Sequence, residues 1–258
     1  MSQDREKIIN LPGVVTALLA IMAAIQFVVS YGPPDAGYSL YDAFAFIPLR
    51  LSFQISPQSV LSAIGAGDAS GPAAETQMAI ALSGGTMAYF TPVTYAFLHG
   101  GWTHLIINGL TLAAFGAPVA RRLGDNRFLV FLAACAAAGA MAHYAFHPLD
   151  VTPVVGASAA ISGTMAAIVR FAFTPGVRLG DSGAIDGREA RTAPLSRLSE
   201  NRQAMFFLVV WFAVNFLLGA FPQAAGASEA VAWEAHIGGF LFGLLSFGAF
   251  DHGSRRGA

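Results

Sequence analysis

Charged residues are scarce in this chain of 258 amino acids. They make up 11% of it, against about 25% in a typical soluble domain, whereas 55% of the residues are hydrophobic and the mean hydropathy is +0.58. This balance excludes an ordinary soluble domain and predicts an integral membrane protein. The formal net charge of −1 provides no basic surface, so we expect no nucleic-acid partner. A single cysteine, Cys135, excludes an intrachain disulfide.

Long apolar segments, in contrast, are abundant. A membrane-spanning helix needs roughly 20 mostly apolar residues. The sequence contains six segments that meet this requirement, at about 11–31, 102–120, 128–146, 155–173, 204–221 and 231–250. We therefore predict an all-α polytopic membrane protein, a bundle of six transmembrane helices in which residues 1–258 form a single membrane domain.

The basic residues indicate how these spans are oriented. If the N-terminus is cytoplasmic, nearly all arginines fall on the inner side, and Arg50 alone falls outside. This asymmetry satisfies the positive-inside rule and places both termini in the cytoplasm. Residues 35–95 then form an extended outer loop segment, and residues 175–203 form a polar cytoplasmic loop. Within the outer segment, 41–53 suits an interfacial structure and 63–77 is expected to be a flexible loop.

Polar residues occur at a common depth in three of the predicted spans. His104, Ser158 and His236 each lie a few residues into a span that enters from the outside. The helical rise places them about 5–10 Å below the outer surface. Asn108 follows His104 by one turn and lies on the same face. Polar groups at membrane depth usually face the protein interior or a wet cavity, so these side chains are candidate functional residues.

Small residues indicate which helices pack closely. The sixth span carries a G-x-x-x-G pattern at residues 239–243, and the fourth carries a small pair at 159–163. Such pairs allow two membrane helices to approach closely. If the two stripes pack together, Ser158 and His236 come within hydrogen-bonding distance.

This meeting would allow nucleophilic catalysis. A histidine can take the proton of a serine hydroxyl during attack and return it to the leaving amine. We find no aspartate or glutamate at a matching depth, and Glu234 lies about 200° around the helix from His236. The sequence therefore predicts a Ser–His dyad rather than a triad.

A tetrahedral intermediate also needs hydrogen-bond donors for its oxyanion. The side chains of His104 and Asn108 can donate from the second span. The backbone N–H of Ser158, at a helix start, is free to donate as well. One such donor typically lowers the barrier by about 3–4 kcal/mol.

Together these motifs resemble the rhomboid family of intramembrane serine proteases. The matching patterns are H-x4-H-x3-N at 99–108, G-x-S at 156–158 and A-H-x-G-G-x3-G at 235–243. The segments "YAFLHGGWTHLIINGLTLAAFG" and "AWEAHIGGFLFG" are also characteristic of bacterial members. The resemblance extends from about residue 85 to residue 250.

The resemblance implies roles for the individual residues. Ser158 is expected to be the nucleophile and His236 the general base. His104, Asn108 and the backbone of Gly156 and Ser158 are expected to stabilise the oxyanion. The implied substrates are membrane proteins, cut near the outer ends of their transmembrane helices. We expect a multi-pass protein of the bacterial inner membrane that uses no cofactor and no catalytic metal.

Two positions depart from the family pattern. Ala159 follows the serine where many members have glycine, which adds one methyl group. Some members carry, four residues after the serine, a tyrosine that stacks on the histidine, and this chain has Ser162 there. The resemblance therefore does not say what orients His236.

Other functional classes remain as alternatives. The membrane histidines suggest a metal or haem site, but the chain has no H-E-x-x-H motif, and His143 is interpreted as a packing residue. A transporter is disfavoured because no internal repeat is evident. A catalytically inactive rhomboid-like protein that binds membrane clients is the remaining alternative, although such a protein would usually lack the serine or the histidine.

Overall fold

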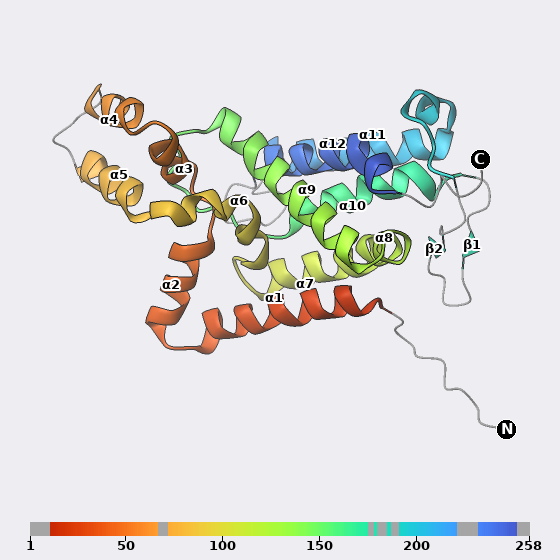
Figure 1. The fold of residues 1–258 in the computed structure, drawn as a ribbon, viewed down its shortest axis with the longest axis horizontal. Coiled ribbons are helices and arrows are strands. Elements are labelled where there is room, and N and C mark those ends of the chain that lie inside the picture. The colour runs from red at the N-terminus through yellow and green to blue at the C-terminus, as the bar shows by residue number, and fades with distance from the viewer. Residues whose placement is uncertain are drawn as a thin grey trace.

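The computed structural model describes residues 11–66, 72–174, 178–179, 185–186, 191–220 and 232–251. This part of the chain is almost entirely helical (Figure 1). The α-helices are α1 Gly13–Tyr31, α2 Pro34–Phe44, α3 Pro48–Ile55, α4 Pro57–Ala66, α5 Pro72–Ser83, α6 Thr91–Thr94, α7 Trp102–Thr111, α8 Ala117–Leu123, α9 Asp125–Phe146, α10 Ser158–Phe171, α11 Arg202–Ala220 and α12 Trp233–Phe250.

Shorter elements connect these helices. Three are 3₁₀-helices, namely η1 Gly85–Tyr89, η2 Tyr95–Phe97 and η4 Leu195–Glu200. A π-helical turn, η3 Leu112–Gly116, joins α7 to α8 without a break in the helix. The strands β1 Arg178–Leu179 and β2 Ile185–Asp186 form an antiparallel pair with Leu179 opposite Ile185.

All six predicted spans coincide with helices, namely α1, the continuous α7–η3–α8 unit, α9, α10, α11 and α12. Within the described residues, Gly13–Tyr31, Trp102–Leu123 and Asp125–Phe146 are long and apolar enough to cross a membrane. Ser158–Phe171 and Arg202–Leu217 are shorter apolar helices. The prediction of a polytopic helical membrane bundle is confirmed.

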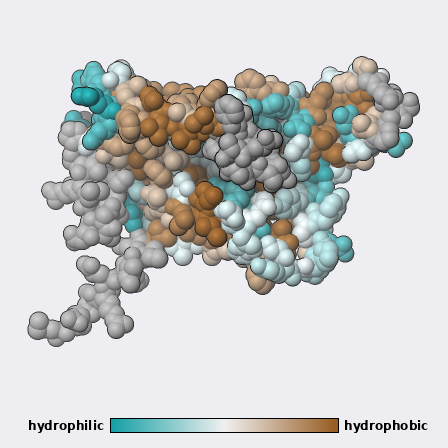
Figure 2. All heavy atoms as spheres, turned by 180° about the vertical axis from the view of Figure 1, so that it is seen from behind, coloured by the Kyte–Doolittle hydropathy of each residue, from teal (hydrophilic) through white to brown (hydrophobic). Residues whose placement is uncertain are grey.

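The surface of the bundle is apolar over broad areas (Figure 2). Large hydrophobic side chains are exposed on helices throughout the bundle: Phe27, Ile107, Leu110, Val130, Phe206, Phe216 and Leu245. In water such a surface would drive aggregation, whereas in a bilayer it meets acyl chains.

Three helices, α9, α10 and α12, pack around small residues at the centre of the bundle. A Cβ atom added at Gly243 would lie 2.5 Å from the carbonyl oxygen of Gly163, and one at Gly239 would collide with the carbonyl of Ala159. The predicted contact between the 159–163 and 239–243 pairs is therefore confirmed. Cys135 of α9 is buried against Gly163, which agrees with its interpretation as a packing residue.

The outer segment is not the extended loop that the sequence suggested. Residues 34–66 and 72–97 are mainly helical, and the structure places α4 and α5 over most of the predicted flexible loop at 63–77, of which residues 67–71 lie outside the described part. The helices α2, α3, α4 and α5 each begin at a proline. Proline is favoured in the first helical turn because a backbone N–H has no intrahelical acceptor there, so no hydrogen bond is lost when proline lacks one. Glycine and proline in this segment therefore mark helix boundaries rather than a continuous loop.

Side-chain contacts hold this outer segment together and against the bundle. The buried guanidinium of Arg50 binds the carboxylate of Asp42 and donates to Ser83 Oγ at 2.8 Å. Ser52 Oγ donates to the carbonyl of Pro148 at 2.6 Å. The outer segment therefore covers the connection between α9 and α10, which the orientation argument placed on the same side of the membrane.

Polar contacts also gather at the C-terminal ends of α8, α10 and α12, away from the outer segment. Arg122 donates to Asp251 Oδ2 at 2.7 Å, and Arg170 Nε donates to the carbonyl of Ala193 at 2.8 Å. Figure 1 shows the β1–β2 pair at this end of the bundle, away from α3, α4 and α5. Much of the predicted loop at 175–203 lies outside the described residues. Its described parts include β1, β2 and η4.

We predict that Gly239→Ala destabilises the protein by about 1–3 kcal/mol, because the added methyl group overpacks the α10–α12 contact. Thermal unfolding in detergent micelles measures the effect. Gly65→Ala in α4 is the matched control, since a Cβ there meets nothing within 4 Å. Equal melting temperatures for the two variants would contradict the close helix contact.

Candidate active site

Ser158 and His236 meet through a hydrogen bond between α10 and α12. Ser158 is the first residue of α10, and His236 lies in the first turn of α12. The distance between Ser158 Oγ and His236 Nε2 is 2.7 Å. Both residues are half-buried, which leaves the pair accessible to a substrate. The predicted meeting of the hydroxyl and the imidazole is therefore present in the structure.

The segment before Ser158 is fixed by its backbone. Gly156 has φ +119°, a conformation that favours glycine. Its N–H donates to the carbonyl of Tyr95 at 3.1 Å. The expectation that Gly156 supplies an oxyanion donor therefore needs correction, because its N–H is already engaged. The N–H of Ser158, at the start of α10, has no intrahelical acceptor and remains the backbone donor of the expected pair.

The second nitrogen of His236 is also occupied. His236 Nδ1 lies 2.8 Å from Asn215 Oδ1, and Asn215 is buried in α11. Asn215 Nδ2 donates to the carbonyl of Trp211 at 2.9 Å, which directs the amide oxygen toward the imidazole. An amide oxygen only accepts hydrogen bonds, so His236 Nδ1 carries the proton. His236 Nε2 is then unprotonated and accepts the hydrogen bond of Ser158.

An aromatic contact holds α11 in the position that this network requires. Trp211, one turn before Asn215, stacks on Phe240, one turn after His236. The ring centroids are 3.9 Å apart and the planes are inclined by 24°. Since α11 and α12 run in opposite directions, the aromatic pair and the amide–imidazole pair form two successive layers of one interface.

Asn215 was not among the predicted site residues, because only a carboxylate was expected to orient the histidine. The available signal was a single amide within the apolar stretch 206–218, since a polar residue at membrane depth usually has a partner. Ser162 does not take over this orienting role. Its Oγ donates to the carbonyl of Ser158 at 2.8 Å, one turn back in the same helix.

His104 lies against Gly156, beside the serine. A Cβ at Gly156 would lie 2.8 Å from His104 Nε2 and 3.7 Å from Ser158 Oγ. His104 Nδ1 accepts the N–H of Gly100 at 3.4 Å, so its other nitrogen carries the proton. This N–H lies next to Ser158, in the place that the expected oxyanion role requires. Glycine at 156 keeps the space between them open.

Asn108 lies one turn deeper than His104 and is buried. Its Nδ2 donates to the carbonyl of His104 at 3.0 Å. This bond uses one of the two hydrogens of the amide nitrogen, and the other has no acceptor among the described residues. The structure places Asn108 on the expected face of α7, next to His104.

His99 packs behind His104. Its ring is fully buried and lies edge-on to the ring of His104, with centroids 5.1 Å apart. Burial, assisted by the neighbouring His104, lowers the pKa of His99 to about 4, so the ring is neutral near pH 7. Tyr41 anchors the backbone here, because its hydroxyl donates to the carbonyl of His99 at 2.6 Å.

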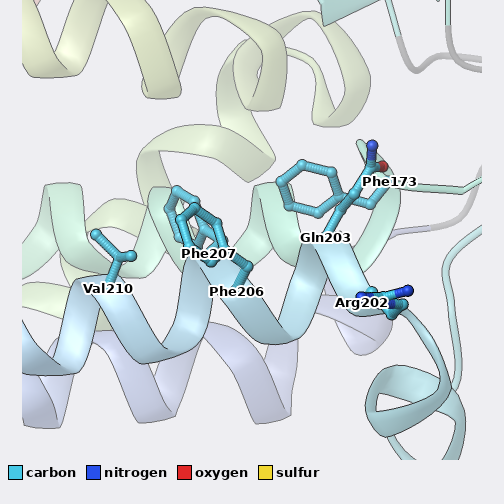
Figure 3. A pocket seen from close by; sticks show the side chains of 6 residues that line it. All are labelled: Phe173, Arg202, Gln203, Phe206, Phe207 and Val210. Carbon is cyan, nitrogen blue, oxygen red and sulfur yellow. The ribbon is translucent and has the colours of Figure 1, made fainter.

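Two other features lie apart from this cluster. The carboxylate of Glu234 points to His147 and His143 rather than to His236, in agreement with its exclusion from a triad. A hollow on α11, lined by residues including Phe206 and Phe207, lies at the end of α10 that is opposite to Ser158 (Figure 3).

Comparison with known proteins agrees with this arrangement. The family model of the Rhomboid domain matches residues 86–250. The protein "Putative rhomboid protease YdcA" of Bacillus subtilis is 39% identical over 71 residues, which are 28% of this chain and 35% of that protein. "Rhomboid protease GluP" of Bacillus subtilis is 37% identical over 84 residues, 33% of this chain and 15% of that protein.

These two alignments span about a third or less of each relative, whereas the domain match includes every residue of the Ser158–His236–Asn215 network and of the His104–Asn108 pair. The chain belongs to the rhomboid family.

Proposed function

We propose that this protein is an intramembrane serine endopeptidase that hydrolyses peptide bonds in or near the transmembrane helices of membrane proteins. The observation that carries the proposal is the 2.7 Å contact between Ser158 Oγ and the unprotonated Nε2 of His236. The names of the two Bacillus relatives, both given as rhomboid proteases, support the same reaction class.

The first half of the reaction transfers the acyl group. Ser158 Oγ attacks the carbonyl carbon of the scissile bond while its proton passes to His236 Nε2. The tetrahedral intermediate collapses, the carbon–nitrogen bond breaks, and the proton on Nε2 moves to the leaving amine. The product is an ester between Ser158 and the N-terminal part of the substrate.

The second half consumes one water molecule. His236 Nε2 takes a proton from the water molecule while the water oxygen attacks the ester carbonyl. Collapse of this second intermediate returns the proton to Ser158 Oγ and releases the carboxylic acid. No metal or cofactor takes part in these steps, so the chemistry needs only the side chains described.

Asn215 would hold His236 in the reactive tautomer throughout the cycle. Its amide oxygen accepts the hydrogen bond of Nδ1–H both before and after Nε2 is protonated. A carboxylate would stabilise the imidazolium more strongly, but a buried charge is costly inside a membrane protein. A neutral amide, itself bonded to the backbone, provides orientation without that cost.

The oxyanion would form between α7 and the start of α10. His104 Nε2–H and the backbone N–H of Ser158 lie beside the Ser158 hydroxyl. The second N–H of the Asn108 amide lies one turn deeper. Donors already fixed in place stabilise the developing charge without reorganisation.

The depth of the network suggests which bonds are cut. Ser158, His236 and His104 lie at the starts of their helices, so cleavage is expected near the outer end of a substrate helix. The substrate helix must open its own hydrogen bonds first, which favours glycine or proline near the cut. The bacterial relatives and the positive-inside pattern suggest a bacterial inner membrane with cytoplasmic termini.

We predict that Ser158→Ala and His236→Ala each abolish cleavage of a model transmembrane substrate in liposomes. Each variant removes a group that forms or transfers a bond. Gel analysis of the cleaved substrate measures activity, and thermal unfolding checks that both variants fold. Cleavage by either variant at the rate of the unaltered protein would leave only the client-binding alternative.

We predict that Asn215→Ala lowers kcat by about 10- to 100-fold with little change in KM, because an unpaired Nδ1–H costs about 1–3 kcal/mol. Asn215→Asp should retain more activity, since a carboxylate also accepts this hydrogen bond. Val214→Ala, at an exposed neighbouring position of α11, is the control. A rise in KM alone, or equal loss in Val214→Ala, would argue against an orienting role.

We predict that Asn108→Ala lowers kcat by about 100-fold or more while KM stays nearly constant, because an oxyanion donor acts mainly in the transition state. Thr111→Ala is the matched control, since Thr111 Oγ1 bonds only within the same helix, to Ile107, in the described contacts. Steady-state kinetics in detergent micelles separates the two constants. Loss of binding with unchanged turnover would be incompatible with this role.

A further inference from the structure

A second group of titratable side chains lies at the outer ends of α9 and α12, outside the network of Ser158. It consists of His143 in the last turn of α9, His147 directly after α9, and Glu234 on α12. One ligand atom from each residue lies within 4.8 Å of the others. The rings of the two histidines lie side by side, with centroids 4.8 Å apart.

The two distances between a histidine and Glu234 are close to those of a tetrahedral ligand set. His147 Nε2 lies 3.1 Å from Glu234 Oε1, and His143 Nδ1 lies 3.5 Å from Glu234 Oε2. Ligands that bind zinc at about 2.0–2.1 Å in tetrahedral geometry are themselves about 3.3 Å apart. An ion between the three groups would therefore require only small side-chain movements.

His143 provides an independent indication of a ligand. It is 6% exposed, and in the described part of the chain its ring nitrogens face the carboxylates of Glu234 and Asp150 without forming a hydrogen bond to either. Buried polar nitrogens are normally paired, because leaving one unpaired is costly. Its Nε2 faces Asp150 Oδ2 at 4.0 Å. A histidine that binds a metal through one nitrogen commonly directs the other to a carboxylate.

The helix packing holds the two sides of this group together. A Cβ at Gly139, one turn before His143, would lie 2.6 Å from the carbonyl oxygen of Ala235. A Cβ at Gly238, one turn after Glu234, would lie 2.7 Å from the carbonyl oxygen of Ala138. This close contact brings the end of α9 against the start of α12, so the ligands are positioned before any ion binds.

We propose that His143, His147 and Glu234 bind a divalent transition-metal ion, with Zn²⁺ as the best fit, and that Asp150 orients His143 from outside the ligand set. Two imidazoles and one carboxylate form a zinc ligand set with a fourth position for water. His147 has a 44% exposed side chain and gives the ion a route from the aqueous side.

The site is distinct from the catalytic network. Both nitrogens of His236 are engaged, by Ser158 and by Asn215, and Glu234 points away from them. Zinc would instead clamp the first turn of α12 to α9. Because that turn also carries His236, the ion would stabilise the framework of the dyad without joining its chemistry.

The test uses full-length protein with Ser158→Ala, purified in detergent and freed of metal by chelator, so that binding is measured without proteolysis. Competition with a chromogenic chelator gives the affinity for Zn²⁺, and the visible absorption of Co²⁺ reports its coordination. We expect one ion per chain, a four-coordinate Co²⁺ spectrum and a Zn²⁺-dependent rise in Tm.

The variants decide whether the ion binds at this site. His147→Gln and Glu234→Gln should weaken Zn²⁺ binding at least about tenfold and remove the rise in Tm, since each loses a ligand. Glu75→Gln, an exposed carboxylate on α5, should leave both unchanged. Absence of Zn²⁺ binding, or binding that persists in His147→Gln and Glu234→Gln, would overturn the proposal. Their melting temperatures without metal control for folding.

Discussion

The close contact between α10 and α12 is the constraint on which the rest of the structure depends. Backbones approach this closely only where side chains are absent or very small, at Gly163, Gly239 and Gly243. A bilayer gives no hydrophobic drive for helix association, so packing and polar contacts must hold the helices together. The same contact brings a hydroxyl of one helix to an imidazole of the other.

The resulting network is neutral, and this suits its surroundings. His236 stands between Ser158 and Asn215, and the Asn215 amide is itself bonded to the backbone of α11. Every member is paired without a resident charge, which avoids the cost of burying a carboxylate. The orientation of the imidazole then depends on α11, held by the stacking of Trp211 on Phe240. Movement of α11 away from α12 would therefore break the contact between Asn215 and His236.

The first turn of α12 presents two different polar faces. His236 faces α10 and α11, whereas Glu234 faces the two histidines at the end of α9. The helices of the outer segment are joined to one another by Arg50, which donates to Ser83. They cover the connection from α9 to α10, where Ser52 donates to the carbonyl of Pro148. Residues 34–66 and 72–97 therefore form a mainly helical layer beside the site, rather than a loose loop.

The sequence by itself determined the spans, the depth of Ser158 and His236, and the small residues that join their helices, because each follows from local composition and spacing. Tertiary structure decided which partner each polar atom contacts. It paired His236 with Asn215, engaged the N–H of Gly156 with Tyr95 and directed Glu234 toward α9. These pairings join residues far apart in the chain, and no local periodicity encodes which partner a side chain meets across a helix interface.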